Sequence, residues 1–284
     1  MSLSSYVFRS IALFGVVVLS GCGLFPSNPP LPKQASIERL PTTADETDFK
    51  AVVAGADIIY FPAERAAYGA RSEPSALILD ALQQSGTPFA IAWDIVDATQ
   101  QPVLDELQGT ADGRRDHVIA RLDLNGTGRA REHCRSVLRE PGLASVRHLA
   151  LRCPAPLVAS IRAGSISPDE QHRISDGFTV PAGGLELYAE RTSTTRGASQ
   201  ADIAGAYRAH VAAQQFAAGR IVDHFRGAGA NGKLLVFVRR EDLVTGQGVP
   251  HYVAQKLQLR QVILGSDAGS QDGRKLLTDA SASQ

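Results

Sequence analysis

Residues 89–108 read FAIAWDIVDATQQPVLDELQ, a strand pattern followed directly by a helix pattern. The run from Phe89 to Trp93 is apolar at every position, which is typical of a strand that is buried on both faces. Residues 99–108 then carry a helical pattern. A doubly buried strand joined to a helix is the repeating unit of an α/β protein with a parallel sheet.

The same alternation continues on both sides of this stretch. Further strands are predicted at 51–61, 146–151, 234–238 and 261–264. Further helices are predicted at 75–84, after Pro154 as far as Gly164, from the capping box Ser167-Pro168-Asp169-Glu170, at 199–227 and at 249–257. We therefore predict an α/β fold, a mostly parallel sheet flanked by helices, with a small helical insertion at about 110–140.

The first residues have the features of a bacterial secretion signal. The apolar run Ile11–Leu19 is too short to span a bilayer permanently, but it suits a signal peptide. Leu19-Ser20-Gly21-Cys22 follows and resembles the lipobox of bacterial lipoproteins, in which the cysteine thiol carries the lipid. The alternative is an ordinary secretory signal in which Cys22 is incidental. We expect residues 1–21 to be a lipoprotein signal peptide and Cys22 to carry palmitate and related acyl chains.

The residue after the cysteine bears on where such a lipoprotein would be sorted. Gly23 stands where an aspartate would favour the inner membrane, so by resemblance to Gram-negative sorting signals we expect anchoring in the outer membrane, facing the periplasm. The proline-rich and polar sequence that follows suits a flexible tether. We predict a tether at 22–48, one folded domain at 49–267 and a disordered tail at 268–284.

Charge and cysteine usage exclude some functions. Lys and Arg together number 29, as do Asp and Glu, so nothing favours a nucleic-acid partner. Cys134 and Cys153 could form a disulfide in the oxidising periplasm, or they could be two unpaired, buried small residues; the sequence leaves both alternatives open. A thiol-redox function is not expected, because no Cys-x-x-Cys motif is present.

In a parallel sheet, ligands bind at the carboxyl ends of the strands. The predicted strands lead out into the segments Pro62–Tyr68, Asp94–Asp97, Arg152–Pro154 and Arg239–Gln247. We therefore look for functional side chains in these four segments.

The same segments resemble the ChaN-like haem-binding family, an iron-regulated lipoprotein group within the wider Tiki/TraB-type superfamily. The resemblance lies in Trp93–Leu104, where a strand ends in an acidic residue before a Gln-Gln-Pro pattern, in Gly142–Glu170, and in Gly232–Pro250 with its Gly-x-Gly-Val-Pro turn. Together they span about residues 51–266. The resemblance implies a haem cofactor, with tyrosine as the iron ligand.

The chain departs from the family where the family carries histidines. The Gly-Glu-x-His motif is represented by Ala63-Glu64-Arg65-Ala66, so the glutamate is kept and the histidine is lost. A downstream histidine pair falls on Arg71 and Ser72, and a Gly-His falls on Glu241-Asp242. A Gln-x-x-x-Asp helix motif keeps Gln214 but has Ala218. Because metal-assisted hydrolysis needs three protein ligands around an open position, we expect a protein that is not an enzyme.

The candidates for binding the cofactor are Glu64, Asp94, Arg239, Tyr68 and Tyr252, and the three charged residues each have a competing structural interpretation. Glu64 is a site carboxylate or a solvated loop charge, and Asp94 has the same ambiguity, while its neighbour Asp97 could cap the 99–108 helix. Arg239, like Arg240, could hold a ligand carboxylate or end a solvated edge strand.

A tyrosinate is a known axial ligand of ferric haem. The mature chain offers Tyr60, Tyr68, Tyr188, Tyr207 and Tyr252. Tyr60 lies inside a strand and is expected in the core. Tyr68 and Tyr252 lie on strand-exit segments, so they are the leading candidates.

The sequence thus favours a non-enzymatic lipoprotein that binds or handles haem in iron acquisition, with a second copy or a haem-uptake receptor as its partner. One rival is a metal-dependent hydrolase that retains activity through Glu64, Asp94 and Asp242. The other rival is a cofactor-free scaffold that binds another protein.

Overall fold

The computed structural model describes residues 35–40, 46–63, 74–110, 112–174, 178–181, 183–191, 199–227, 231–243 and 248–264. Six parallel strands form one sheet in the order β1-β6-β2-β5-β3-β4. This confirms the predicted α/β class. The strands are β1 (Ser36–Leu40), β2 (Ile58–Pro62), β3 (Phe89–Asp97), β4 (Arg147–Arg152), β5 (Lys233–Val238) and β6 (Arg260–Leu264).

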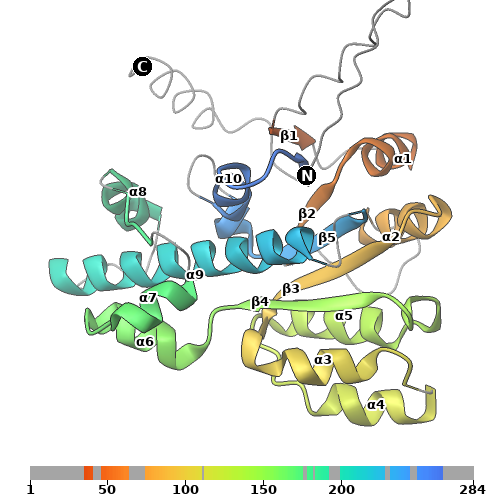
Figure 1. The fold of residues 1–284 in the computed structure, drawn as a ribbon, viewed down its shortest axis with the longest axis horizontal. Helices are drawn as coiled ribbons and strands as arrows, with labels where there is room; N and C mark the ends of the chain where they lie inside the picture. The colour runs from red at the N-terminus through yellow and green to blue at the C-terminus, as the bar shows by residue number, and fades with distance from the viewer. Residues whose placement is uncertain are drawn as a thin grey trace, which may run out of the picture. The chain divides into compact units, whose positions relative to one another are not determined.

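Helices connect the strands (Figure 1). The α-helices are α1 (Glu46–Gly55), α2 (Pro74–Gln84), α3 (Gln101–Leu107), α4 (Asp112–Ala120), α5 (Gly128–Arg139), α6 (Ala155–Ala163), α7 (Pro168–Ile174), α8 (Gly184–Arg191), α9 (Gln200–Arg226) and α10 (Val249–Ala254). Short 3-10 segments lie at η2 (Ala98–Gln100), η3 (Pro141–Leu143) and η5 (Arg240–Leu243). The predicted insertion corresponds to α4 and α5.

The sheet is buried on both faces because successive side chains of a strand point to opposite sides. Along β3, Ile91 and Trp93 belong to a core shared with α1 to α5. Ala90 and Ala92 belong to a second core, which contains residues of α9 and α10. A smaller cluster joins α6 and α7 to α9. None of the described helices combines the length and the apolar character that crossing a membrane requires.

The predicted capping box at Ser167 is present at the start of α7. The Ser167 backbone N–H donates to Glu170 Oε2 at 2.8 Å, and the Glu170 N–H donates to Ser167 Oγ at 3.2 Å. The long helix α9 begins with the same arrangement at Ser199 and Asp202. Each box satisfies backbone donors that would otherwise lack partners.

Two predictions near the start of the domain are wrong. Residues 51–55 belong to helix α1, not to a strand, because Phe49, Val52 and Val53 line one helix face in the core. Part of the expected tether is strand β1, which pairs with β6. A two-pronged ion pair, in which Arg260 donates to Glu38 from Nε at 3.1 Å and from a terminal nitrogen at 3.0 Å, reinforces that pairing. The folded domain therefore begins before residue 49.

The Gln-Gln-Pro segment protects the edge strand β4. The Gln101 amide donates to the His148 carbonyl at 2.8 Å and accepts from the Ala150 N–H at 2.8 Å. Arg220 of α9 donates to the Ala150 carbonyl at 3.2 Å and to Gln101 Oε1 at 2.8 Å. Side chains thus occupy backbone groups that a further strand would otherwise pair with.

A buried arginine holds the helical insertion together. Arg115 of α4 donates from Nε to the Leu138 carbonyl at 2.5 Å and from a terminal nitrogen to the Leu107 carbonyl at 3.4 Å. These carbonyls end α5 and α3, where helix dipoles favour a cation. Cys134 and Cys153 are free and buried, and they belong to separate core clusters. Of the two alternatives for these cysteines, the structure has the unpaired one.

Candidate functional site

The carboxyl ends of β3 and β5 bring two of the predicted site residues together. The two strands are neighbours, pairing through Trp93 and Phe237. Beyond Trp93 the pairing of β3 with β4 is irregular, and Asp94 lies within that irregular stretch. Arg239 directly follows β5, and η5 then turns back with Glu241 and Asp242. Asp94 and Arg239 therefore meet, although they are 145 positions apart in the sequence.

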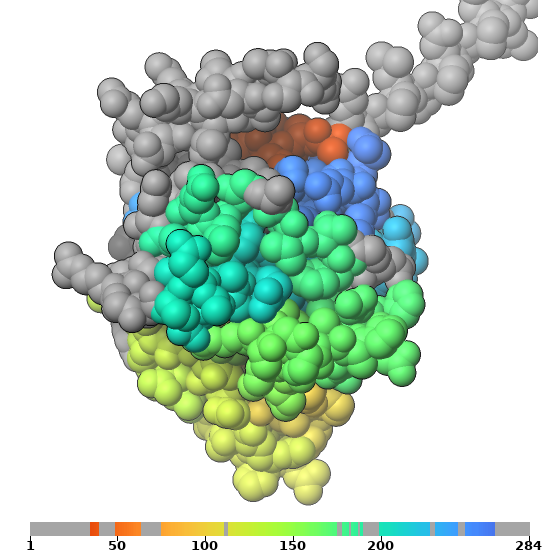
Figure 2. Space-filling view, turned by 90° about the vertical axis from the view of Figure 1, so that its left-hand side faces the viewer, coloured from red at the N-terminus to blue at the C-terminus, as the bar shows by residue number. Residues whose placement is uncertain are grey.

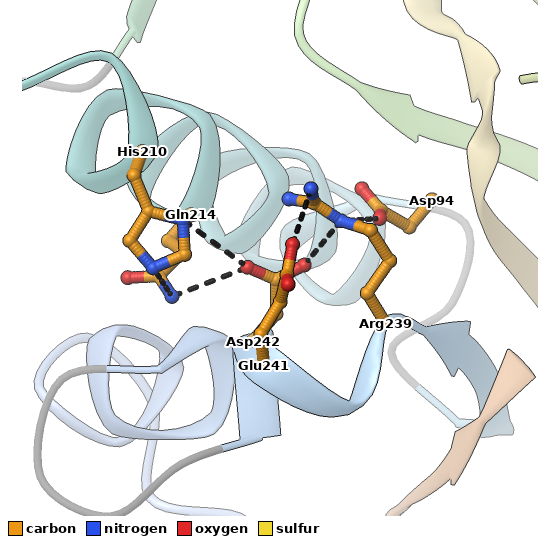
Figure 3. A network of polar contacts seen from close by, with 6 residues as sticks. All are labelled: Asp94, His210, Gln214, Arg239, Glu241 and Asp242. Carbon is orange, nitrogen blue, oxygen red and sulfur yellow. Dashed lines mark hydrogen bonds and ion pairs between the residues drawn. The ribbon is translucent and has the colours of Figure 1, made fainter. Parts of the chain in front are cut away.

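Arg239 is the centre of a network of ion pairs (Figure 3). Its Nε lies 3.1 Å from Asp94 Oδ2 and 2.9 Å from Asp242 Oδ2. A terminal nitrogen lies 2.6 Å from Glu241 Oε1. Three carboxylates thus contact one guanidinium, and β5 lies inside the sheet, so Arg239 is not the solvated end of an edge strand. A ligand carboxylate at Arg239, the other alternative for this residue, would compete with these ion pairs.

The network changes the acidity of its members. Burial raises the pKa of Asp242 to about 7; Arg239 opposes this rise, whereas Asp94 and Glu241 add to it. Burial alone would lower the pKa of Arg239, but Asp242, Asp94 and Glu241 outweigh it, so the pKa lies above its usual value. The site therefore contains a fixed cation and a carboxyl group that exchanges its proton near neutral pH.

Helix α9 extends the network through Gln214 and His210. The Gln214 amide nitrogen donates to Asp242 Oδ1 at 3.2 Å and lies 3.0 Å from His210 Nε2. Burial, followed by Arg239, lowers the pKa of His210 to about 4, so the ring is neutral at pH 7. With Nε2 accepting from Gln214, the ring proton lies on Nδ1, which faces Asp242 Oδ1 at 3.9 Å.

Tyr188 adjoins His210, and Tyr207 adjoins Tyr188. The Tyr188 ring of α8 lies 5.2 Å from the His210 ring and 5.6 Å from the Tyr207 ring, between centroids. Burial, followed by the charge of Glu241, raises the pKa of Tyr188, whereas Arg162 and Arg239 lower it. Tyr188 is only partly buried, as are Phe178, Val180 and Leu185, which pack against the same core. The view in Figure 2 shows α8 in green beside α9 in turquoise and α10 in blue.

The other predicted residues fall elsewhere. Tyr252 lies in the core between α10 and α9, with 7% of its surface exposed, and its hydroxyl has no hydrogen-bond partner of good geometry among the described residues. Tyr60 is a core residue as expected and donates to Gln261 at 2.7 Å. Asp97 caps η2, at the start of the predicted helix, by accepting from the Thr99 N–H at 2.9 Å. Glu64, Tyr68 and Cys22 lie outside the described residues.

The sequence indicated Gln214 through the Gln-x-x-x-Asp motif, but it did not predict His210 and Tyr188 as site residues. His210 and Gln214 are four positions apart, on one face of α9, so a helical projection anchored on Gln214 would have pointed to His210. Tyr188 gave no such signal, because α8 itself was not predicted. Within the described ranges, no three histidine, cysteine or acidic side chains are grouped so that they could hold a metal ion.

A separate hollow lies at the other end of the strands. It has a volume of about 710 Å³ and is lined by residues that include Asp57, Thr87 and Lys233, which precede or begin β2, β3 and β5. In parallel sheets, ligands bind at the carboxyl ends of the strands, whereas this hollow lies at their amino ends. We therefore do not assign the site to it.

A scan against family models gives no match, and no curated protein matches the chain in sequence. Among solved structures, the chain is similar to one described as "Cofacial heme binding to ChaN of Campylobacter jejuni". The TM-score is 0.52 at 15% identity, and the match covers 76% of this chain and 84% of that chain. At this identity the likeness shows the fold, which is ChaN-like.

Proposed function

We propose that this domain binds haem at the carboxyl edge of its sheet, beside α8 and α9. The observation that carries the proposal is Tyr188, a partly buried phenol next to His210 and the Arg239 network. The ChaN-like fold supports it, because the similar solved structure is of a haem-binding protein.

The residues around Tyr188 suit the chemistry of a haem group. A phenol oxygen is a known ligand of ferric haem iron, and the cofactor would supply that iron. Phe178, Val180 and Leu185 offer partly exposed apolar surface for the faces of the macrocycle. Arg162 lies within electrostatic range of the Tyr188 phenol and would attract a propionate, a role for which Arg239 has less capacity. Tyr188 therefore replaces the buried Tyr252 as our preferred ligand.

The cellular part of the proposal rests on the sequence. Cys22 would anchor the protein in the outer membrane, facing the periplasm, and the domain would bind or pass on haem in iron acquisition without catalysing a reaction. The lipobox-like Leu19–Cys22 and the following Gly23 support this location. A second copy of the chain or a haem-uptake receptor would be the partner.

A hydrolase is the second candidate. Asp242, whose pKa burial raises to about 7, lies in one network with Asp94, and a carboxyl group with such a pKa suits proton transfer. This candidate predicts turnover of an ester or peptide that Asp242→Asn abolishes and hemin does not affect.

The deciding experiment is a hemin titration of the chain from residue 23 onward, which keeps all the residues that the structure describes. A saturable Soret band in the parent, weakened in Tyr188→Phe and unchanged in Tyr60→Phe, would support the proposal. Tyr68→Phe and Tyr252→Phe test the ligands that the sequence favoured. A parent protein without a saturable band would contradict haem binding.

A further inference from the structure

A chain of contacts leads from the buried carboxyl group of Asp242 to the ring of Tyr188. Asp242 has only 2% of its surface exposed, and it accepts from Arg239 on one oxygen and from Gln214 on the other. Gln214 in turn contacts His210, and the His210 ring packs against Tyr188. The contacts measure 3.2 Å from Gln214 to Asp242, 3.0 Å from Gln214 to His210, and 5.2 Å between the ring centroids of His210 and Tyr188. The residues come from η5, α9 and α8.

The contacts restrict the orientation of the imidazole. Gln214 has two amide hydrogens, of which one serves Asp242 and the other faces His210 Nε2. Nδ1 then carries the ring proton and faces the same carboxylate. A flipped ring would place the Cε1–H group against the Gln214 donor and lose the accepting nitrogen there, so the network favours a single orientation of His210.

Tyr188 thereby packs against two restrained rings of α9. One is His210, and the other is Tyr207, whose hydroxyl donates to the Pro181 carbonyl at 3.2 Å. A partly exposed tyrosine without such neighbours would sample several rotamers, and ordering it on binding would cost affinity.

We propose that His210 is a positioning residue for Tyr188, and that Gln214 and Asp242 act through it to fix the phenol in the orientation that receives the iron. This inference rests on the proposed haem function. It assigns a role to His210, which lies outside the family's motifs, and to Gln214 and Asp242, which fall on motif positions. Groups that orient a metal ligand from outside contribute about 10- to 100-fold in affinity. The effect should therefore be measurable while the fold stays intact.

The test compares His210→Leu and Gln214→Met with matched controls on another helix. His251 of α10 and its C-cap residue Gln255 form the same four-residue pair, with nitrogens 3.0 Å apart, and none of the contacts given for this pair involves the Arg239 network. His251→Leu and Gln255→Met therefore remove an equivalent contact. Circular dichroism verifies that each variant is folded, and only folded variants are compared.

Two measurements are made on each protein. Hemin titration gives the affinity, and the charge-transfer absorption of the ferric complex reports the phenolate bond. Fluorine NMR of fluorotyrosine-labelled protein without haem, assigned through Tyr188→Phe, reports the order of the Tyr188 ring. We expect His210→Leu and Gln214→Met to weaken hemin binding about 10-fold or more, to alter the charge-transfer absorption, and to shift or broaden the Tyr188 resonance.

The outcomes separate the two proposals. Equal affinity and an unchanged Tyr188 resonance in a parent that binds hemin would overturn the positioning role and leave the haem function standing. Equal losses in the α10 controls would also overturn it, since the effect would then be general. A parent that does not bind hemin would overturn the proposed function, and the positioning role with it.

Discussion

The Arg239 guanidinium donates to Asp242 at 2.9 Å, in a place where Asp242 is almost completely removed from solvent. Two further carboxylates, of Asp94 and Glu241, contact the same guanidinium. A single cation therefore offsets the charge of three acidic side chains that come from two strand ends.

Arg239→Met should lower the free energy of unfolding by about 2–3 kcal/mol, because it leaves acidic groups close together without their cation. The loss should be smaller in the Asp242→Asn background, since one of those acids is then neutral. Urea denaturation of the parent, the two single variants and the double variant measures this coupling. Additive losses would contradict an energetic link between Arg239 and Asp242.

The pH dependence of stability should differ between the parent and Asp242→Asn. The pKa of Asp242 is raised from 3.8 to about 7 on folding, so between these values the folded state binds more protons than the unfolded state. This contribution to stability is fully present below pH 4 and is lost as the pH rises towards 7. The stability of Asp242→Asn relative to the parent should therefore increase from pH 4 to 7, by no more than about 1.4 kcal/mol per pH unit.

Buried histidines make stability fall as the pH decreases, which is the opposite of the effect of Asp242. The parent and Asp242→Asn both contain these histidines. Burial lowers the pKa of His210 and His133 to about 4 and of His148 to about 3, so the unfolded state binds their protons first as the pH falls below 6.5. Both proteins should lose stability in acid for this reason. Thermal unfolding at several pH values gives both curves, and a constant difference between them would argue against a raised pKa of Asp242.

Gln101→Leu should destabilise the protein by about 2 kcal/mol and promote self-association. The substitution removes the amide that serves the backbone of His148 and Ala150, and it exposes part of the β4 edge. Gln100→Leu is the matched control, because the Gln100 side-chain oxygen is buried without a partner among the described residues. Denaturation and sedimentation velocity test both variants. A Gln101→Leu protein as stable and monomeric as the control would refute the protective role.

Arg115→Met should weaken the helical insertion more than the rest of the domain. Arg115 is 3% exposed and links the carboxyl ends of α3 and α5, so its loss removes the donor given for the Leu138 carbonyl, whereas the Leu107 carbonyl keeps the Thr110 N–H. A cost of about 2–3 kcal/mol is expected. Hydrogen exchange should accelerate in α4 and α5 before it does in the sheet. The neighbouring, exposed Arg114→Met should leave exchange unchanged, and uniform acceleration across the domain would contradict a local role.

Cys22→Ser should abolish lipid attachment, because the thiol is the proposed acyl acceptor. Labelling of cells with radioactive palmitate and fractionation of their membranes measure the effect. Loss of label and release from the membrane are expected for Cys22→Ser, whereas Cys134→Ser should remain labelled. A labelled serine variant would exclude Cys22 as the lipidated residue.

The sequence by itself determined the α/β class and most of its elements. Runs such as Phe89–Trp93 are apolar without interruption, and the Ser167 capping box marks a helix start through contacts within four residues. The apolar runs and the capping box are both local patterns, so they can be recognised without knowing how the rest of the chain folds. The sequence also pointed to Asp94 and Arg239, since parallel strands deliver their carboxyl ends to one edge.

Only the tertiary structure decided how these residues are used. The short run at 51–55 suits a strand or a helix, and packing of Val52 and Val53 against the core selects the helix. Strand β1 was missed because pairing with β6, more than 200 residues away, is what makes it a strand.

The same holds for the site. Asp242, His210 and Tyr188 come from η5, α9 and α8, and their association depends on how those elements pack on the sheet. Burial, which raises the pKa of Asp242 and keeps His210 neutral, is a property of that packing. Distance along the chain gives no measure of distance in space, so the pattern of residues alone could not join these three side chains into one site.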